Sequence, residues 1–186
     1  MINKIEKLFR LDGKVIVITG AAGLLGKMHA DAIAAYGGIP ILLDISVSEA
    51  QKKSSELNSK FGINSIGMSV DITNEKEIEN NLEEIISIYG KIDGLVNNAA
   101  NNPKIESNSI KNFSRLENFP LQTWYEDINV GLTGSFLCSK HYGAAIANNK
   151  DGGSIVNISS DLGLIAPDQR LYMKEGVPLE LQAVKP

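Results

Sequence analysis

The fold of this chain is decided by the stretch VIVITGAAGLLG, residues 15–26. A run of β-branched apolar residues leads there into a turn that contains three glycines. The segment after the turn carries apolar residues at helical spacing, namely Leu25, Met28, Ala32 and Ile33. The pattern therefore predicts a strand, a tight loop and a helix in succession.

The three glycines of the loop, Gly20, Gly23 and Gly26, are spaced as Gly-x-x-Gly-x-x-Gly. This spacing differs from the Gly-x-Gly-x-x-Gly fingerprint, so alone it is a weak signal, and a glycine-rich turn without a ligand is the alternative. Asp44 closes the next apolar run, residues 39–44. Rossmann folds place the carboxylate that binds the adenosine ribose roughly 20 residues beyond the glycines. The loop and Asp44 together predict a Rossmann unit, whose glycines let the backbone approach a pyrophosphate at a helix N-terminus.

Length and composition fit one globular domain over residues 1–186, with 43% hydrophobic residues. The net charge of −4 and the lack of a Lys or Arg run argue against nucleic acid or an anionic membrane as partners. The sequence shows neither a signal peptide in its charged first ten residues nor a bilayer-spanning stretch, so we expect a cytosolic protein. Cys138, the single cysteine, is predicted to be a buried structural thiol. His29 and His141 are too few and too distant in sequence to suggest a metal site.

The rest of the chain alternates between strand and helix patterns. Strands are predicted at residues 63–71, 92–97 and 154–160, and helices at 46–61, 74–89 and 122–148. Residues 101–119 have no convincing period and predict a loop or lid at a strand end, a usual place for substrate contacts. The alternation predicts an α/β fold, a Rossmann-type doubly wound parallel sheet with helices on both faces.

Five signals in this order resemble the short-chain dehydrogenase/reductase family, and the likeness extends almost to Ser160. They are Thr19-Gly20 through Gly26, Asp44, Asp71-Ile72, Asn97-Asn98-Ala99-Ala100, and Asn129 followed by Ile155-Val156-Asn157-Ile158-Ser159-Ser160. The asparagine motifs are most similar to those of the compact reductase branch. The resemblance implies NAD(P)-linked hydride transfer between a secondary alcohol and a ketone.

The resemblance also implies which residues bind the cofactor. The set is Gly20, Gly23, Leu25, Gly26, Asp44, Asp71, Ile72, Asn98, Ala99 and Ala100. The glycines are expected around the pyrophosphate and Asp71-Ile72 at the adenine. Asp44 is expected to accept hydrogen bonds from the ribose hydroxyls and to repel a 2′-phosphate, which favours NAD over NADP. A helix-capping role is the alternative for Asp71.

Two residues are implied in catalysis. Ser160 matches the serine that positions the substrate oxygen, and Asn129 matches the residue that holds a helix kink and a proton-relay water. The family's Tyr-x-x-x-Lys pair is absent, because Tyr172 is followed by Lys174 and Gly176 stands four positions on. A helix needs the four-residue spacing to place both side chains on one face.

We therefore expect residues 161–186 to be a loop or insertion, and the tyrosine and lysine to follow Pro186 together with the C-terminal strands and helices. The chain alone is then expected to be inactive, with residues 154–159 as a bare apolar edge, and the complete protein to be a homo-oligomer acting on a small molecule. Two alternatives remain open. One is a catalytically silent dinucleotide-binding module. The other, suggested by the glycine spacing, is an enzyme of the extended branch that acts on sugar nucleotides as an epimerase or dehydratase.

Overall fold

The computed structural model describes residues 7–101, 115–178 and 182, and in these residues a five-stranded parallel sheet is the centre of the fold. The strand order is β3-β2-β1-β4-β5. The strands are β1 (Val15–Thr19), β2 (Ile39–Asp44), β3 (Ile66–Ser69), β4 (Gly94–Asn97) and β5 (Ser154–Asn157). The chain moves outward from β1 in one direction and then, after β3, returns to add β4 and β5 on the other side. The predicted doubly wound parallel sheet is confirmed.

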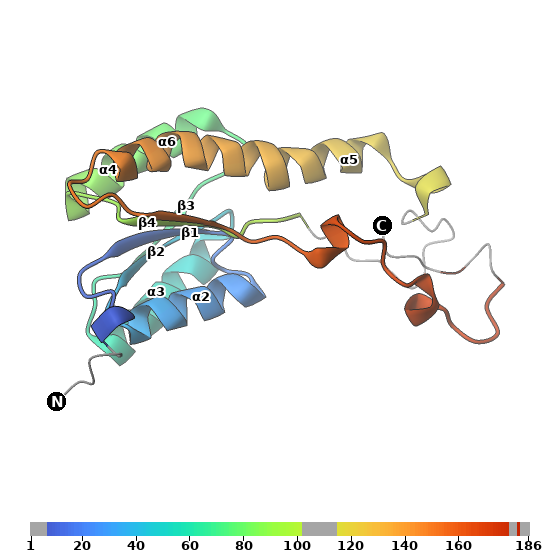
Figure 1. The fold of residues 1–186 in the computed structure, drawn as a ribbon, viewed down its shortest axis with the longest axis horizontal. Helices are drawn as coiled ribbons and strands as arrows, with labels where there is room; N and C mark the ends of the chain where they lie inside the picture. Colours follow the sequence, from blue (N-terminus) through green and yellow to red (C-terminus); the bar gives the residue numbers. More distant parts are fainter. Residues whose placement is uncertain (1–6, 102–114, 179–181, 183–186) are drawn as a thin grey trace.

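Helices cover both faces of the sheet (Figure 1). They are α2 (Leu24–Ala35), α3 (Val47–Phe61), α4 (Glu75–Tyr89), α5 (Leu121–Ile128) and α6 (Ser135–Ala147). Short 3-10 turns occupy Leu116–Asn118, Asp161–Gly163 and Gln169–Tyr172. Helices α2 and α3 lie below the sheet in Figure 1, and α4 and α6 lie above it. No helix in the described part of the chain is both long and apolar enough to cross a membrane.

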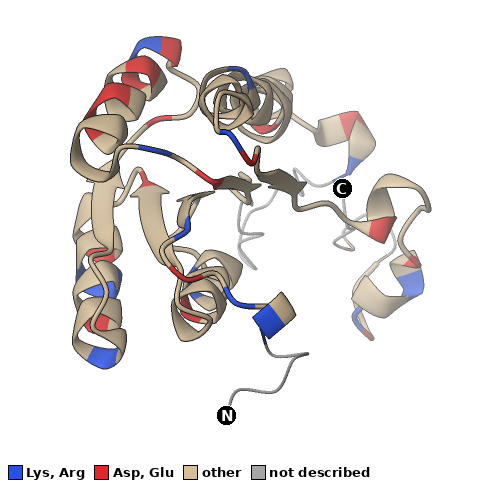
Figure 2. Ribbon diagram, turned by 60° about the vertical axis from the view of Figure 1, so that its left-hand side comes forward, with Lys and Arg blue, Asp and Glu red and all other residues tan. Residues whose placement is uncertain are grey.

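Alternation along the strands divides the apolar side chains between two cores. Val15, Val17 and Leu95 point to the α4 and α6 side, whereas Ile18 and Val96 point to the α2 and α3 side. Since both faces are covered, the strands are apolar on both sides and appear as continuous hydrophobic runs in the sequence. Lys, Arg, Asp and Glu lie mainly on the helices and loops around the sheet (Figure 2).

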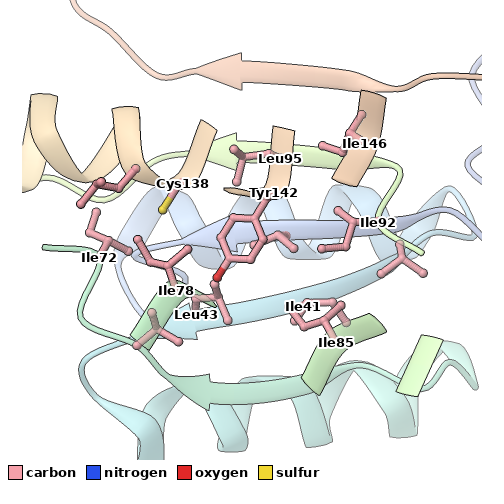
Figure 3. Close-up of a cluster of buried hydrophobic side chains, with 14 residues drawn as sticks. Ile41, Leu43, Ile72, Ile78, Ile85, Ile92, Leu95, Cys138, Tyr142 and Ile146 are labelled. Carbon is pink, nitrogen blue, oxygen red and sulfur yellow. The ribbon is translucent and has the colours of Figure 1, made fainter. Parts of the chain in front are cut away.

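Tyr142 of α6 points into the centre of the larger core (Figure 3). Its hydroxyl donates a hydrogen bond of 2.7 Å to Oδ1 of Asn81 on α4, so the buried polar atom is satisfied. Cys138 lies one turn earlier and is fully buried, as the sequence predicted. Burial raises the pKa of its thiol to about 12. Cys138 therefore acts as a small apolar side chain in the core.

The helix predicted at 122–148 is built from α5, a π-helical segment Asn129–Gly134, and α6. The change of winding begins at Asn129. Gly134 ends the segment, and a Cβ at this position would lie 2.6 Å from Cδ1 of Ile72. The side of α6 that faces the sheet carries Leu137, Cys138, Tyr142 and Ile146. Four other apolar side chains of this helix are exposed, namely Trp124, Ile128, Leu132 and Phe136.

Asp93 connects two strands at the end of the sheet that lies away from the glycine loop. At the amino end of β4, Asp93 accepts hydrogen bonds of 2.9 Å from the Val15 backbone N–H and from Lys14 Nζ. Burial opposes the charge of Asp93, but hydrogen bonds from Lys91, Lys14 and Val15 outweigh it and hold the pKa of the carboxyl below its ordinary value. This contact ties β1 to β4 at the end of the sheet opposite to the glycine loop.

The strand β5 forms one margin of the sheet. It pairs with β4, and within residues 7–101, 115–178 and 182 no further strand lies beyond it. Ile155 and Val156 are 40% and 49% exposed. The described residues thus leave the apolar edge that the sequence suggested.

Candidate functional site

A cleft of about 750 Å³ opens at the carboxyl ends of β1, β2 and β4. It is lined by Gly20, Ala22, Gly23, Leu24, Leu25, Asp44, Ile45, Ser46, Glu49, Asp71, Ile72, Asn98, Ala99, Ala100, Asn101 and Val130. β1 lies between β2 and β4, and the strand order reverses there, because β2 and β3 lie on one side of β1 and β4 and β5 on the other. The cleft therefore lies at the switch point where open α/β sheets bind their ligands.

The glycine loop leaves no space for a side chain at Gly20 or at Gly26. Gly20 has a φ of +62°, and a Cβ on it would lie 2.8 Å from the Cα of Ala99. A Cβ on Gly26 would lie 2.3 Å from the carbonyl oxygen of Gly20, so the loop and the first turn of α2 touch through backbone. Gly23 is the N-cap of α2 and offers no capping side chain. The positive end of this helix therefore faces the cleft without a capping oxygen, as an anion site requires.

Asp44 connects the glycine loop with the start of α3. Its Oδ2 accepts a hydrogen bond of 2.9 Å from the Ala22 N–H, and its Oδ1 accepts one of 2.9 Å from the Ser46 N–H. The side chain lines the cleft and is partly buried. A carboxylate can accept further hydrogen bonds at each oxygen, so Asp44 can hold the loop and bind two hydroxyl groups at once.

Thr19 and Asn98 join the ends of β1 and β4. The buried Thr19 hydroxyl oxygen accepts hydrogen bonds of 3.1 Å from the N–H groups of Asn98 and Ala99. The Asn98 side-chain amide donates to the carbonyl oxygens of Thr19 at 3.0 Å and Gly20 at 3.1 Å. Asn98 thus fixes the glycine loop against the wall of the cleft. The sequence marked Thr19 only as part of a motif and did not reveal this role.

Asp71 and Ile72 form the wall after β3. The carboxylate of Asp71 accepts hydrogen bonds from the Thr73 N–H at 2.9 Å and the Thr73 hydroxyl at 2.7 Å. Asn74, not Asp71, caps α4 with its side chain. Ile72 is buried and packs against Gly134 of the π-helical segment. The winding of that segment therefore sets one boundary of the cleft.

Nine of the ten residues predicted to bind a cofactor line this one cleft, and Gly26 packs directly behind it. Their roles toward a ligand stay predictions. Of the seven other lining residues, Ala22 and Leu24 belong to the predicted glycine loop and Asn101 to the predicted loop at 101–119. The remaining four were not predicted to line a site: Ile45, Ser46, Glu49 and Val130. For Glu49 a signal was available, since an acidic residue in the first turn of a helix that begins just after Asp44 must lie near the same strand end.

Neither of the two predicted catalytic residues is among those that line the cleft. Asn129 opens the π-helical segment next to Val130, which does line it. Ser160 follows β5, is exposed, and accepts a hydrogen bond of 3.2 Å from the Leu162 N–H. β4 and β5 are parallel neighbours, and the Ile158 N–H donates to the Asn97 carbonyl oxygen at 2.9 Å. Ser160 therefore follows the carboxyl end of β5, which is the end of the sheet where the cleft opens.

A second group of polar side chains joins α4 and α6. Glu75, Glu79 and His141 place ligand atoms within 4.8 Å of one another. Both carboxylates form ion pairs with lysines, because Lys140 Nζ lies 2.5 Å from Glu75 and Lys76 Nζ lies 3.0 Å from Glu79. Hydrogen bonds from Lys140 and then His141 hold the pKa of Glu75 below its usual value. The group is best described as an interhelical ion-pair cluster.

Comparisons with known proteins agree with this geometry. A sequence model described as short chain dehydrogenase matches residues 14–172. An NAD-dependent glycerol dehydrogenase of Listeria innocua is 31% identical over 166 residues, which are 89% of this chain and 60% of that protein. An NADP-dependent mannitol dehydrogenase of Alternaria alternata is 30% identical, over 88% of this chain and 59% of that protein. The chain thus spans about three fifths of the length of these relatives.

A solved structure has the same arrangement of strands and helices. The crystal structure of an NAD+-bound xylitol dehydrogenase aligns with a TM-score of 0.75 and 25% identity. The alignment covers 84% of this chain and 56% of the xylitol dehydrogenase.

Proposed function

This chain belongs to the short-chain dehydrogenase family of oxidoreductases, and from this premise we propose that its cleft binds NAD for hydride transfer between a secondary alcohol and a ketone. The carrying observation is that a glycine-rich loop, an uncapped helix N-terminus and a carboxylate line one cleft at the switch point of the sheet. These are the three groups that a dinucleotide requires: backbone for the pyrophosphate, a positive helix end, and an acceptor for ribose hydroxyls.

The preference for NAD over NADP is supported by the charge of the cleft. Asp44 and Glu49 line it together, and a 2′-phosphate would have to approach both. The two relatives described above include one NAD-dependent and one NADP-dependent enzyme, so the preference belongs to this chain's own residues.

We propose a small polyol or related sugar alcohol as the substrate. Support comes from the names of the similar proteins, which are dehydrogenases of glycerol, mannitol and xylitol. When bound, the nicotinamide supplies the hydride acceptor or donor. In this proposal Ser160 positions the substrate oxygen, and Asn129 holds the kink of the helix and a proton-relay water. That the protein works in the cytosol stays a prediction from the sequence.

Titration with NADH tests the proposal directly. We expect the chain to bind NADH with a dissociation constant between about 1 μM and 1 mM, because cofactor and substrate affinities usually lie in this range. Enhancement of nicotinamide fluorescence on binding is the measurement, and NMNH, which lacks the adenosine half, is the control ligand. Equal affinity for NADH and NMNH would contradict an adenosine site at Asp44.

A second candidate function is dinucleotide binding without turnover. It is favoured by the absence of any Tyr-x-x-x-Lys within the 186 residues. Reduction of NAD in the presence of glycerol, mannitol or xylitol, measured on the protein purified from its native source, separates the two functions. A silent binding protein shows affinity for NADH and no polyol-dependent change in absorbance.

We further propose that the exposed side of α5 and α6 pairs with a second copy of the chain. Trp124, Ile128, Leu132 and Phe136 recur every four residues along one side of the helix and are 36% to 65% exposed. Burial of such a stripe is favourable by about 25 cal/mol per Å². In Figure 1, α5 extends past the end of the sheet.

Sedimentation velocity at increasing concentration is expected to show a dimer or larger species. Leu132→Glu should shift it toward monomer, while Leu164→Glu, a matched change at a side chain that is 92% exposed, should not. Association that survives Leu132→Glu would assign the contact to another surface.

A further inference from the structure

Two carboxylates line the same end of the cleft. Asp44 ends β2, and Glu49 lies in the first turn of α3, with Ile45 and Ser46 of the connecting segment also at the cleft wall. The two oxygens of Asp44 accept backbone hydrogen bonds, whereas Oε2 of Glu49 accepts a hydrogen bond of 3.0 Å from Lys27 Nζ. The carboxylates thus have different partners, although they line one surface.

The Lys27–Glu49 ion pair connects two helices that both begin at the cleft. Lys27 lies in the first turn of α2, just after the glycine loop, and its side chain is 38% exposed, while that of Glu49 is 48% exposed. The hydrogen bond from Lys27, followed by the charges of Lys27 and Lys52, holds the pKa of Glu49 below its ordinary value. Glu49 is therefore ionised at neutral pH and carries a full negative charge at the cleft.

The start of α3 would otherwise suit an anion. Ser46 is its N-cap residue and makes no side-chain capping hydrogen bond. Helix N-termini attract phosphate groups, and the ribose that Asp44 is proposed to bind would bring its 2′ position to this end of the cleft. Glu49 is the acidic residue in that first turn, so it offsets the positive potential there.

We propose that Glu49 is a specificity-determining residue that acts beside Asp44 to reject the 2′-phosphate of NADP. Glu49 acts in two ways. Its charge repels the phosphate, and its ion pair holds Lys27 of α2, which does not itself line the cleft, away from the phosphate. The inference rests on the proposed function, because it assigns a part of the same dinucleotide site. A 2′-hydroxyl carries no charge, so NAD is little affected by either action.

Four proteins test the two actions: the unchanged chain, Glu49→Gln, Lys27→Met and the double variant. The measurement is the pair of dissociation constants for NADH and NADPH. Glu49→Gln should tighten NADPH binding roughly tenfold, the effect expected of one partly exposed charge near a helix end, and leave NADH within about twofold. The double variant should lose the part of this gain that the freed lysine supplies and keep the part that comes from removing the Glu49 charge.

Glu56→Gln is the matched control. Glu56 lies on the same helix, is exposed and does not line the cleft, and its substitution makes the same change in net charge. It should leave both dissociation constants unchanged. An equal gain for Glu56→Gln would reduce the effect to net charge and overturn the assignment.

The outcomes separate the inference from the proposed function. Binding of NADH by the unchanged chain with no change in the NADPH to NADH ratio in Glu49→Gln would overturn the role of Glu49 alone. Full retention of the gain in the double variant would overturn the role of Lys27. Failure of the unchanged chain to bind either dinucleotide would instead overturn the proposed function.

Discussion

Gly20→Ala should weaken NADH binding by about 100-fold, which corresponds to roughly 2.8 kcal/mol. The new Cβ would lie 2.8 Å from the Cα of Ala99, and both residues line the cleft. Since the obstacle is backbone, one of the two segments must move. Gly20 also accepts hydrogen bonds of 3.1 Å at its carbonyl oxygen from the Gly23 N–H and the Asn98 amide, so its displacement disturbs the whole loop.

Gly62→Ala is the matched control for this change. Gly62 has nearly the same φ, +65°, but a Cβ there meets nothing within 4 Å, and it caps α3 away from the cleft. Both alanines carry the backbone strain of a left-handed conformation, about 1–2 kcal/mol. Thermal unfolding should show that cost in both proteins, whereas only Gly20→Ala loses NADH affinity. Equal NADH affinity in the two variants would contradict a pyrophosphate site at the glycine loop.

Asp44→Ala should weaken NADH binding by about 30-fold and NADPH binding much less, so that discrimination between them relaxes. The carboxylate is the proposed acceptor for the ribose hydroxyls, and its charge opposes a 2′-phosphate. The substitution also removes the acceptors for the Ala22 and Ser46 N–H groups, which should lower the free energy of unfolding by about 2 kcal/mol.

Asp44→Asn removes the negative charge of this side chain and keeps its size, so it separates the electrostatic effect of Asp44 from its structural effect. Asparagine keeps one acceptor oxygen and the same size, so it should retain more of the stability while losing the repulsion of a 2′-phosphate. Dissociation constants for both dinucleotides, measured alongside denaturant unfolding, distinguish the two contributions. An unchanged NADPH to NADH ratio in both variants would show that Asp44 does not select the cofactor.

The fold was predictable because each strand and each helix has a local signal. The β-branched run 15–19 and the closing Asp44 each mark an element boundary that the structure shares. The parallel order then follows, since short strand–helix–strand connections allow few other arrangements. For the same reason, residues predicted at separate strand ends come together at one cleft.

Features that depend on contacts across the chain were not predictable. Apolar spacing indicated a helix after residue 121 but not which side packs, and Trp124 and Phe136 are exposed because the sheet contacts the side that carries Tyr142. Likewise the apolar Leu25 and Met28 of α2 are exposed, while the small Ala30 and Ala34 pack inside. The ion pair between Glu49 and Lys27 joins residues 22 positions apart in sequence, so no local pattern indicated it. The predicted loop at 101–119 falls mostly outside the described residues.

The buried thiol of Cys138 can be used to measure how often α6 separates from the sheet. It is the single cysteine of the sequence, its thiol is fully buried, and a pKa of about 12 leaves almost no thiolate at neutral pH. A thiol reagent can therefore label the folded chain only during transient separation of α6 from the sheet. The labelling rate, divided by the rate for the unfolded chain, measures how often that separation occurs, and a slower rate with NADH present would show that ligand binding at the cleft is coupled to the packing of the core.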